Sequence, residues 1–212
     1  MERIRGWGRR MGERENGNQC TVALKEWALT CRALRDGLQV VLLRKGGLLD
    51  EDGVFHLEHR AFWLQPTFLH QDETLVKPEF RGLLREVQEG REAGENRRFF
   101  KFDLWAEVTD TFALGPDDEA RLKAVSHIWS NAYLDLRFSY KPDNPLLCAV
   151  LRVYERKEPH VVAVREEDMG CRSWIELAEG LDCGGMRPVL GDGEFGVLRG
   201  AVEQILNEAG NL

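Results

Sequence analysis

The chain has 212 residues, which fits one domain of ordinary size, and its hydrophobic fraction of 43% is enough for a core. No apolar run approaches the roughly 20 residues of a membrane-spanning helix, and the basic start lacks the apolar stretch of a secretory signal. The five cysteines include no CxxC pair, so we expect reduced thiols, a cytoplasmic location, no metal and no membrane partner. The net charge of −7 weakens nonspecific DNA binding but leaves room for a local basic cleft.

The first third of the chain predicts a tail, a helix and two strands. Residues 1–18 are rich in Gly, Arg and Asn and predict a disordered tail, in which Met11 offers a second start of translation. Apolar residues at helical spacing predict a helix over 21–36 that ends at an Asp-Gly pair. The segment 38–47, LQVVLLRKGG, predicts a buried strand with a Gly-Gly turn, and alternation predicts a second strand over 54–64.

The rest of the chain predicts helices and strands in irregular alternation. Helices are expected over 79–97, 116–129, 173–180 and 196–209, and strands over 99–114, 145–156 and 161–167. Ser173 is expected to cap the third of these helices, with Glu176 at the capping-box position. Because there is no βαβ rhythm, we predict a single α+β domain over 19–212. Its sheet is expected to be mixed or antiparallel, or a partial β-barrel, with flanking helices.

The side chains best suited to chemistry lie between Arg44 and Lys77. Arg44 and Lys45 leave the end of a predicted strand, and the small residues Gly46 and Gly47 let backbone amides approach a phosphate closely. The other candidates for ligand binding in this window are Arg60, Lys77, Gln71 and Trp63, with Phe62 as an alternative to Trp63. The cations would hold phosphate and an aromatic ring would stack on a base, which predicts recognition of a nucleotide or nucleic acid.

Three histidines of the same window support two alternatives. His59 and His70, each near a carboxylate such as Glu58, predict general acid–base catalysis in a small hydrolase or nuclease. A metal site would add His56, but residues 56 and 59 point to opposite faces of a strand, and the spacing matches no compact zinc signature. A structural alternative pairs Arg44 with Glu58 across two strands and places the aromatic rings in the core.

Seven segments carry a resemblance to a known family. They are LKEWA (24–28), LLRKGG (42–47), EHRAFWLQPT (58–67) with HQ (70–71), LVKP (75–78), RFSYKP (137–142), PLLCAVLRVY (145–154) and GCRSW (170–174). In this order they resemble the bacterial family catalogued as domain of unknown function 1802, over roughly residues 22–180. The family usually shows Tyr at the position of Gln65 and Ile at that of Leu48, and neither difference touches a charged candidate.

The resemblance implies a biological context for this chain but no established activity. Some members of that family look to be associated with restriction-endonuclease-like domains, which implies a link to restriction–modification or defence. This chain has no readable PD…(D/E)xK motif, since Pro116-Asp117 is followed by no ExK at the expected place. A second resemblance, over residues 31–47, is to the helix–Gly–strand entry of ASCH and PUA-like domains, which commonly bind RNA or modified DNA bases.

These observations predict a nucleic-acid or nucleotide-recognising module that needs no cofactor. Two alternatives stay open, namely a small hydrolase or nuclease with a His/Glu site, and a structural or interaction protein without a ligand. The sequence leaves the ligand and the oligomeric state open.

Overall fold

The computed structural model describes most of the chain. The described residues are 18–46, 55, 57–68, 71–94, 98–168 and 172–207, with the backbone alone for 91–94 and 167. The predicted tail therefore lies outside the described residues except for Asn18, and Gly47, His56 and His70 lie outside them as well.

The chain folds into seven strands and five helices over the described residues, which confirms the predicted α+β class. The strands are β1 (Gln19–Trp27), β2 (Val41–Arg44), β3 (Ala61–Thr67), β4 (Phe99–Leu114), β5 (Leu146–Ala163), β6 (Trp174–Asp182) and β7 (Arg187–Pro188). The helices are α1 (Ala28–Arg35), α2 (Arg81–Gly94), α3 (Glu119–Ala124), α4 (Asn131–Ser139) and α5 (Asp192–Asn207). Short 3-10 turns occupy Glu73–Leu75, Pro78–Phe80, Pro116–Asp118 and Glu166–Asp168.

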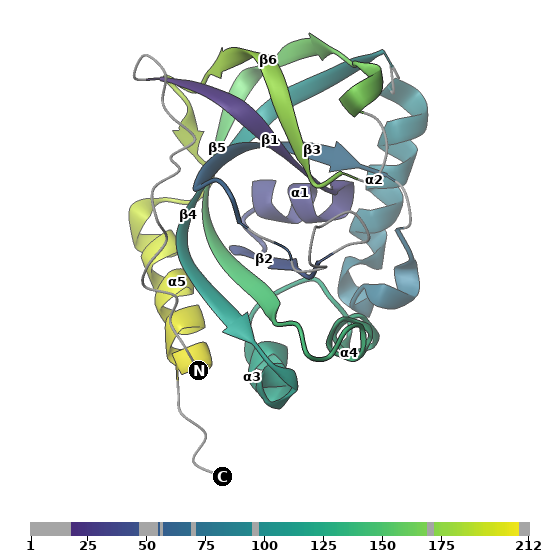
Figure 1. The fold of residues 1–212 in the computed structure, drawn as a ribbon, viewed down its shortest axis with the longest axis vertical. Helices are drawn as coiled ribbons and strands as arrows, with labels where there is room; N and C mark the ends of the chain where they lie inside the picture. The colour runs from purple at the N-terminus through teal and green to yellow at the C-terminus, as the bar shows by residue number, and fades with distance from the viewer. Residues whose placement is uncertain are drawn as a thin grey trace.

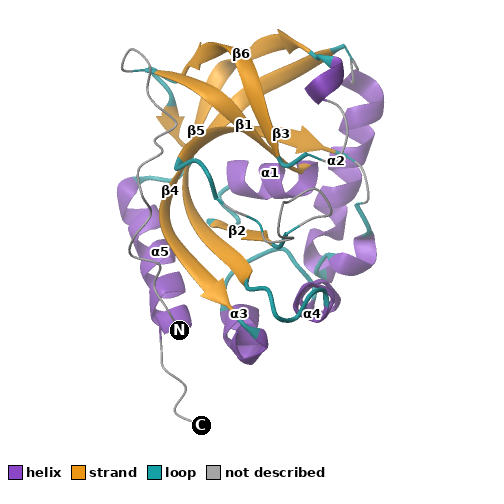
Figure 2. Ribbon diagram, viewed as in Figure 1, coloured by secondary structure: helices purple, strands orange, loops and turns teal. Residues whose placement is uncertain are grey.

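The strands form one mixed and strongly curved sheet (Figure 2). Its order is β2-β5-β4-β3-β1-β6, with β7 also paired to β5, and β1 with β3 is the parallel pair. Within the described part of the chain no backbone ladder joins β2 to β6, so the sheet is not closed into a barrel. Helix α1 lies within the curve of the sheet, with β1 and β3 on one side and β2 on the other (Figure 1).

The longest part of the sheet is the antiparallel pair of β4 and β5. The predicted strand over 99–114 is confirmed as β4, and the two strands expected over 145–156 and 161–167 form the continuous strand β5. The register of this pair shifts at Phe102/Leu104 and again at Val108/Asp110. Such irregularities bend a strand and increase its twist, which accounts for the curvature of the sheet.

The first part of one predicted helix and most of another are strands. Residues 19–27 form β1, and the expected helix begins only at Ala28; residues 174–182 form β6, where a capped helix was expected. β1 pairs with β3 on one side and β6 on the other, so packing overrides the helical spacing of its apolar residues. In β6 the buried Ile175 and Leu177 alternate with exposed residues, the period of a half-buried strand.

The remaining boundaries differ from the predictions by a few residues. Helix α2 begins at Arg81 and α5 at Asp192, and the helix expected over 116–129 is a 3-10 turn followed by α3, which ends at Ala124. Helix α1 ends as expected at the Asp-Gly pair, where Gly37 has a φ of +68°. No described helix is long and apolar enough to cross a membrane.

The core has two parts, one on each face of the sheet. One contains Trp63, Phe102 and Leu24, and the other packs α1, α3, α4 and α5 against the opposite face through residues such as Leu29 and Tyr133. Cysteines 20, 31 and 148 are free and buried in these parts. Between the two parts, at the N-terminus of α1, lie the charged side chains described next.

Candidate anion-binding site

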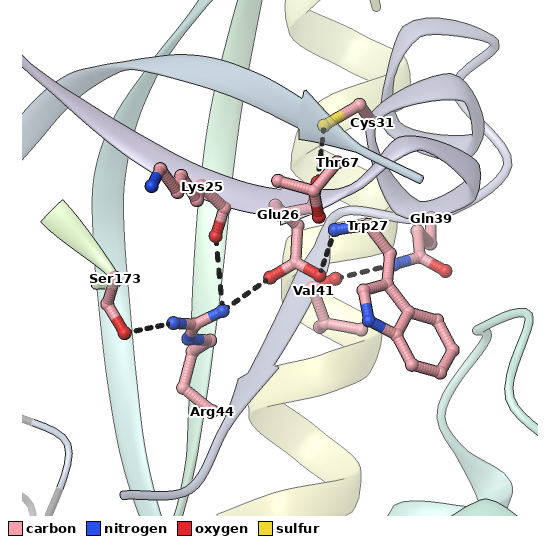
Figure 3. Close-up of polar contacts among 9 residues, drawn as sticks. All are labelled: Lys25, Glu26, Trp27, Cys31, Gln39, Val41, Arg44, Thr67 and Ser173. Carbon is pink, nitrogen blue, oxygen red and sulfur yellow. Dashed lines mark hydrogen bonds and ion pairs between the residues drawn. The ribbon is translucent and has the colours of Figure 1, made fainter. Parts of the chain in front are cut away.

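Arg44, the last residue of β2, reaches across the open side of the sheet (Figure 3). Its Nη1 donates to the Lys25 carbonyl oxygen at 3.3 Å and to Glu26 Oε2 at 3.1 Å, and its Nη2 donates to Ser173 Oγ at 2.6 Å. Its guanidinium also lies 4.7 Å from the centre of the Phe55 ring. β2 is at one end of the strand order, while Lys25 and Glu26 belong to β1, and Ser173 precedes β6 at the other end. Arg44 therefore joins the two ends of the sheet by side-chain contacts.

Glu26 is the acidic partner of Arg44 and is 6% exposed. Its Oε1 accepts the backbone N–H of Trp27 at 2.8 Å, directly before α1, so each carboxylate oxygen has a donor (Figure 3). A carboxylate at a helix N-terminus is favoured by the helix dipole. The predicted structural pair of Arg44 with Glu58 is wrong, because the ion pair forms with Glu26.

Lys45 is 8% exposed, yet no acceptor among the described residues lies within hydrogen-bond distance of its Nζ. Burial lowers the pKa of its ammonium, and the charge of Arg137 lowers that pKa further. Both effects disfavour the charged form of Lys45, because its ammonium is partly removed from water and lies near a second positive charge. An anion that reached this position would stabilise the ammonium.

Arg137 comes from α4, which packs on the other side of the cluster. Its guanidinium lies 4.8 Å from the centre of the Tyr133 ring, and that ring stacks on Trp129 at 4.2 Å with an interplanar angle of 13°. Burial opposes the charge of Arg137, but Tyr133 and Glu26 outweigh it and raise its pKa. Arg137 thus lies within electrostatic reach of both Lys45 and Glu26.

We call Arg44, Lys45 and Arg137, gathered around Glu26, the basic cluster. Its three cations and one carboxylate leave a surplus of two positive charges. Nε of Arg44 and Nε of Arg137 are buried and have no hydrogen-bond partner. Unused donors on buried cations are costly unless an acceptor satisfies them. The arrangement is suited to binding an anion.

Other predicted ligand residues have structural contacts. Gln71 accepts the Leu29 N–H at 3.2 Å and donates to the Thr67 carbonyl at 3.1 Å, so it links α1 to the end of β3. Trp63 is 0% exposed and meets Phe102 edge-on, so its ring offers no free face to a base. Phe62 is also fully buried, with its ring against Trp174.

Three more of the predicted ligand residues, Gly46, Arg60 and Lys77, are described by the structure. Gly46 is buried next to Lys45, and Arg60 is exposed before β3. Lys77 is half-buried, and its backbone N–H donates to the Ile128 carbonyl at 2.9 Å. The prediction that these residues bind a ligand stays a prediction, as does that for Gly47, which lies outside the described residues.

The predicted catalytic residues do not form a hydrogen-bonded pair. His59 Nε2 lies 4.0 Å from Glu58 Oε2, and the His59 ring meets Trp174 edge-on at 5.0 Å. Burial lowers the pKa of His59, while Glu58 and Glu176 oppose that effect. His70 lies outside the described residues, so its role stays a prediction. No group of three His, Cys, Asp or Glu residues in the described part of the chain is arranged to hold a metal ion.

Two residues of the site, Glu26 and Ser173, were not among the sequence candidates, and Arg137 lies in a stretch, residues 127–145, whose mixture of aromatic and basic side chains favours a second wall of a cleft. These three residues come from β1, α4 and the segment before β6, far from Arg44 in the chain. Ser173 was expected to cap a helix; its hydroxyl instead accepts a hydrogen bond from Arg44. The alternation of residues 174–178 was a signal for β6 that could have placed Ser173 at a strand end.

Comparison with known proteins identifies a family. Residues 23–200 match the family model described as Domain of unknown function (DUF1802). No curated protein matches the chain. Two crystal structures of mutant forms of ZmASCH from Zymomonas mobilis are similar in structure, each with 10% sequence identity and a TM-score of 0.38. The match covers 84% of this chain and 94% or 96% of the ZmASCH chains.

Proposed function

Since the chain belongs to the family described as Domain of unknown function (DUF1802), whose description assigns no activity, we propose a function from the site itself. The protein recognises a phosphate-bearing ligand, a nucleotide or a nucleic acid, and the basic cluster holds the phosphate. The proposal keeps two of the sequence candidates, Arg44 and Lys45, and adds Arg137.

The observation that carries the proposal is Lys45. Lys45 is 8% exposed, and burial and the charge of Arg137 both lower the pKa of its ammonium, so its charged form is disfavoured when no anion is bound. A bound anion would supply the missing acceptor and would offset the repulsion. Sites whose charged groups are poorly satisfied without a ligand are typical of binding sites.

Phosphate fits the cluster better than a single carboxylate does. A phosphate group presents several acceptor oxygens at once, and guanidinium groups recognise it with directed hydrogen bonds. Here the Nε atoms of Arg44 and Arg137 are buried donors without partners. Tyr140, the residue directly after α4, is exposed and could stack on a base.

Binding of labelled oligonucleotides tests the proposal. Fluorescence anisotropy would measure single-stranded RNA, single-stranded DNA and duplex DNA over rising salt, for the wild type, Lys45→Met and Arg137→Met. We expect each variant to weaken binding about tenfold and to reduce the salt slope for single strands by about 0.7, the loss of one phosphate contact. Lys157→Met is the matched control, because Lys157 is an exposed residue of β5.

Two results would overturn the proposal. One is no binding of any oligonucleotide or mononucleotide by the wild type at low salt. The other is binding that Lys45→Met and Arg137→Met leave unchanged, which would place the ligand elsewhere on the surface.

We also propose a cytoplasmic role in restriction–modification or defence. The support is the resemblance to a family of which some members look to be associated with restriction-endonuclease-like domains. Phage plating on cells that carry the wild-type gene or the Lys45→Met variant tests it. Plating that is equal for wild type, variant and deletion would reject the role in defence and leave the binding proposal standing.

A further inference from the structure

We propose that the outer face of the β4–β5 pair, where β4 begins and β5 ends, is a stacking surface for single-stranded nucleic acid. A base stacks on the Phe99 ring there, and Lys101 binds a phosphate. The class of ligand rests on the proposed function, whereas the surface is a different one from the basic cluster. We call its four residues the ribbon face, namely Phe99, Lys101, Val161 and Ala163.

The register of the two strands brings the residues of the ribbon face together. Phe99 lies opposite Ala163, and Lys101 lies opposite Val161, in the antiparallel pair of β4 with β5. Directly opposite residues have Cβ atoms about 5 Å apart, and residues two apart on one strand lie about 7 Å apart on the same face. The four side chains therefore form one contiguous patch.

The other face of the same two strands packs against the core. Phe102 is 0% exposed, and Phe100 and Val162 are half-buried against the part of the core to which it belongs. Because successive side chains of a strand point to opposite faces, the ribbon face points away from this core. All four of its residues are exposed, with 44% for Phe99 and 58% for Val161.

An apolar outer face is unusual in such a strand pair. Antiparallel strands with one face on the core commonly present polar side chains to water. Here three of the four outward residues are apolar, and Phe99 and Val161 are two of the six large apolar residues that are exposed in the described part of the chain. Single exposed apolar side chains need no explanation, but a contiguous patch often marks an interaction surface.

The composition of the ribbon face favours a nucleic-acid strand over a protein. Lysine is depleted in the centre of protein–protein interfaces, whereas an aromatic ring beside a cation is the combination with which proteins bind single strands. None of the four residues is acidic, and Asp103, the next acidic residue along β4, is paired with Arg35 at 2.5 Å. The local charge is therefore positive in a chain whose net charge is −7, which suits an anionic strand.

The size of the ribbon face also argues against a second copy of the chain as its partner. A stable protein–protein interface buries about 800 Å² on each partner, from about 20–30 residues. Four side chains supply a small part of such an area, but they are enough to hold one or two nucleotides by stacking and one phosphate contact. The adjoining stretch of β5 contains Lys157 and Pro159, residue types that disfavour strand pairing between chains.

Fluorescence anisotropy with labelled single strands tests the ribbon face. Phe99→Val removes the ring and keeps a residue suited to a strand, so we expect the variant to fold and to bind single-stranded RNA and DNA about tenfold more weakly. Phe99→Trp keeps a stacking ring and should bind at least as tightly as the wild type. Lys101→Met should reduce the salt slope for single strands by about 0.7, the loss of one phosphate contact.

Duplex DNA and a second exposed apolar residue serve as controls. The bases of a duplex already stack on one another, so Phe99→Val should leave the affinity for duplex DNA unchanged. Val197→Ser changes a residue of α5 that is 73% exposed, and it should leave all affinities unchanged. The midpoint of urea unfolding shows whether each variant keeps its stability. If Phe99→Val lowers this midpoint, the salt slope of Lys101→Met decides the proposal.

The outcomes separate the ribbon face from the proposed function. Binding that Lys45→Met weakens, but that Phe99→Val and Lys101→Met leave unchanged, would overturn the ribbon face and keep the basic cluster. Binding that only the variants of the ribbon face weaken would support this surface and overturn the phosphate site at the basic cluster. No binding of any oligonucleotide would overturn the ribbon face, and no binding of mononucleotides either would overturn both.

Two further results would overturn stacking on Phe99. One is an equal loss of affinity for single strands and for duplex DNA in Phe99→Val, because the ring would then act through the fold. The other is a dimer of the wild type, seen in sedimentation, that Phe99→Val dissociates, because a second copy of the chain would then cover the ribbon face.

Discussion

Replacing Arg44 by methionine should destabilise the protein more than the loss of an ordinary surface ion pair does. The substitution keeps an unbranched side chain of similar length and removes the donors to Glu26, Lys25 and Ser173. It leaves the Glu26 carboxylate, 6% exposed, with the Trp27 N–H as its one remaining described partner. The change therefore leaves a buried carboxylate without the guanidinium that lies within ion-pair distance of it.

The size of the effect follows from the exposure of the two partners. Removing one member of a fully buried ion pair costs about 3–5 kcal/mol. The Arg44 side chain is 19% exposed, so water and ions screen part of the interaction, and we expect about 2–3 kcal/mol. Arg32→Met is the matched control: Arg32 pairs with Asp36 on the surface of α1, and its loss should cost less than about 0.5 kcal/mol.

Urea unfolding followed by tryptophan fluorescence measures these differences as changes in midpoint at constant slope. The double variant Glu26→Gln/Arg44→Met removes both charges and should be more stable than the sum of the two single changes predicts, by about 1–2 kcal/mol. The reasoning is refuted if Arg44→Met costs no more than Arg32→Met, or if the two single effects add without coupling.

Two further predictions concern parts of the fold away from the cluster. Burial, helped by the charge of Lys77, lowers the pKa of His127 to about 4, below its value of 6.5 in the unfolded chain. The unfolded chain then binds the extra proton first, so the free energy of unfolding should fall by about 3 kcal/mol between pH 6.5 and pH 4. In His127→Gln this part of the pH dependence should vanish, and an unchanged profile of unfolding free energy against pH would contradict the assignment. Arg199 of α5 binds both carboxylate oxygens of the buried Asp110, at 2.6 Å and 3.0 Å, so Arg199→Ala should loosen α5 by about 1–2 kcal/mol. Hydrogen exchange should then show faster exchange in α5 with β4 unchanged, and unaltered protection of α5 would refute the contribution.

Sequence patterns predicted those elements whose pattern is set locally. The alternation over 99–114 is long enough to identify β4, and the Asp-Gly pair after residue 35 places the end of α1. β1 was missed because its pairing with β3 and β6 is a long-range interaction that no window of the sequence contains. Ser173 was misread for a related reason, since a capping pattern and an alternating strand overlap in residues 173–177.

The site was predictable in part. Arg44 and Lys45 stood out because two cations precede a Gly-Gly turn, and the structure places both in one cluster with Arg137. Glu26 could not be identified, because a glutamate within a predicted helix over 21–36 carries no sign of burial or of a distant partner. The contact between Arg44 and Glu26 depends on the curvature of the whole sheet.

The origin of the cluster in distant segments has a consequence for how the protein folds. Residues 115–145 join β4 to β5, so this pair closes a much shorter loop than β1 with β6 does, loses less entropy and can form earlier. The basic cluster needs β1, β2, α4 and the segment before β6 together, and β1 pairs with β6 across about 150 residues of chain. We therefore expect the cluster to assemble in the last steps of folding. The capacity to bind phosphate would then mark chains that have completed folding, and a partly folded chain would contain the β4–β5 pair without the site.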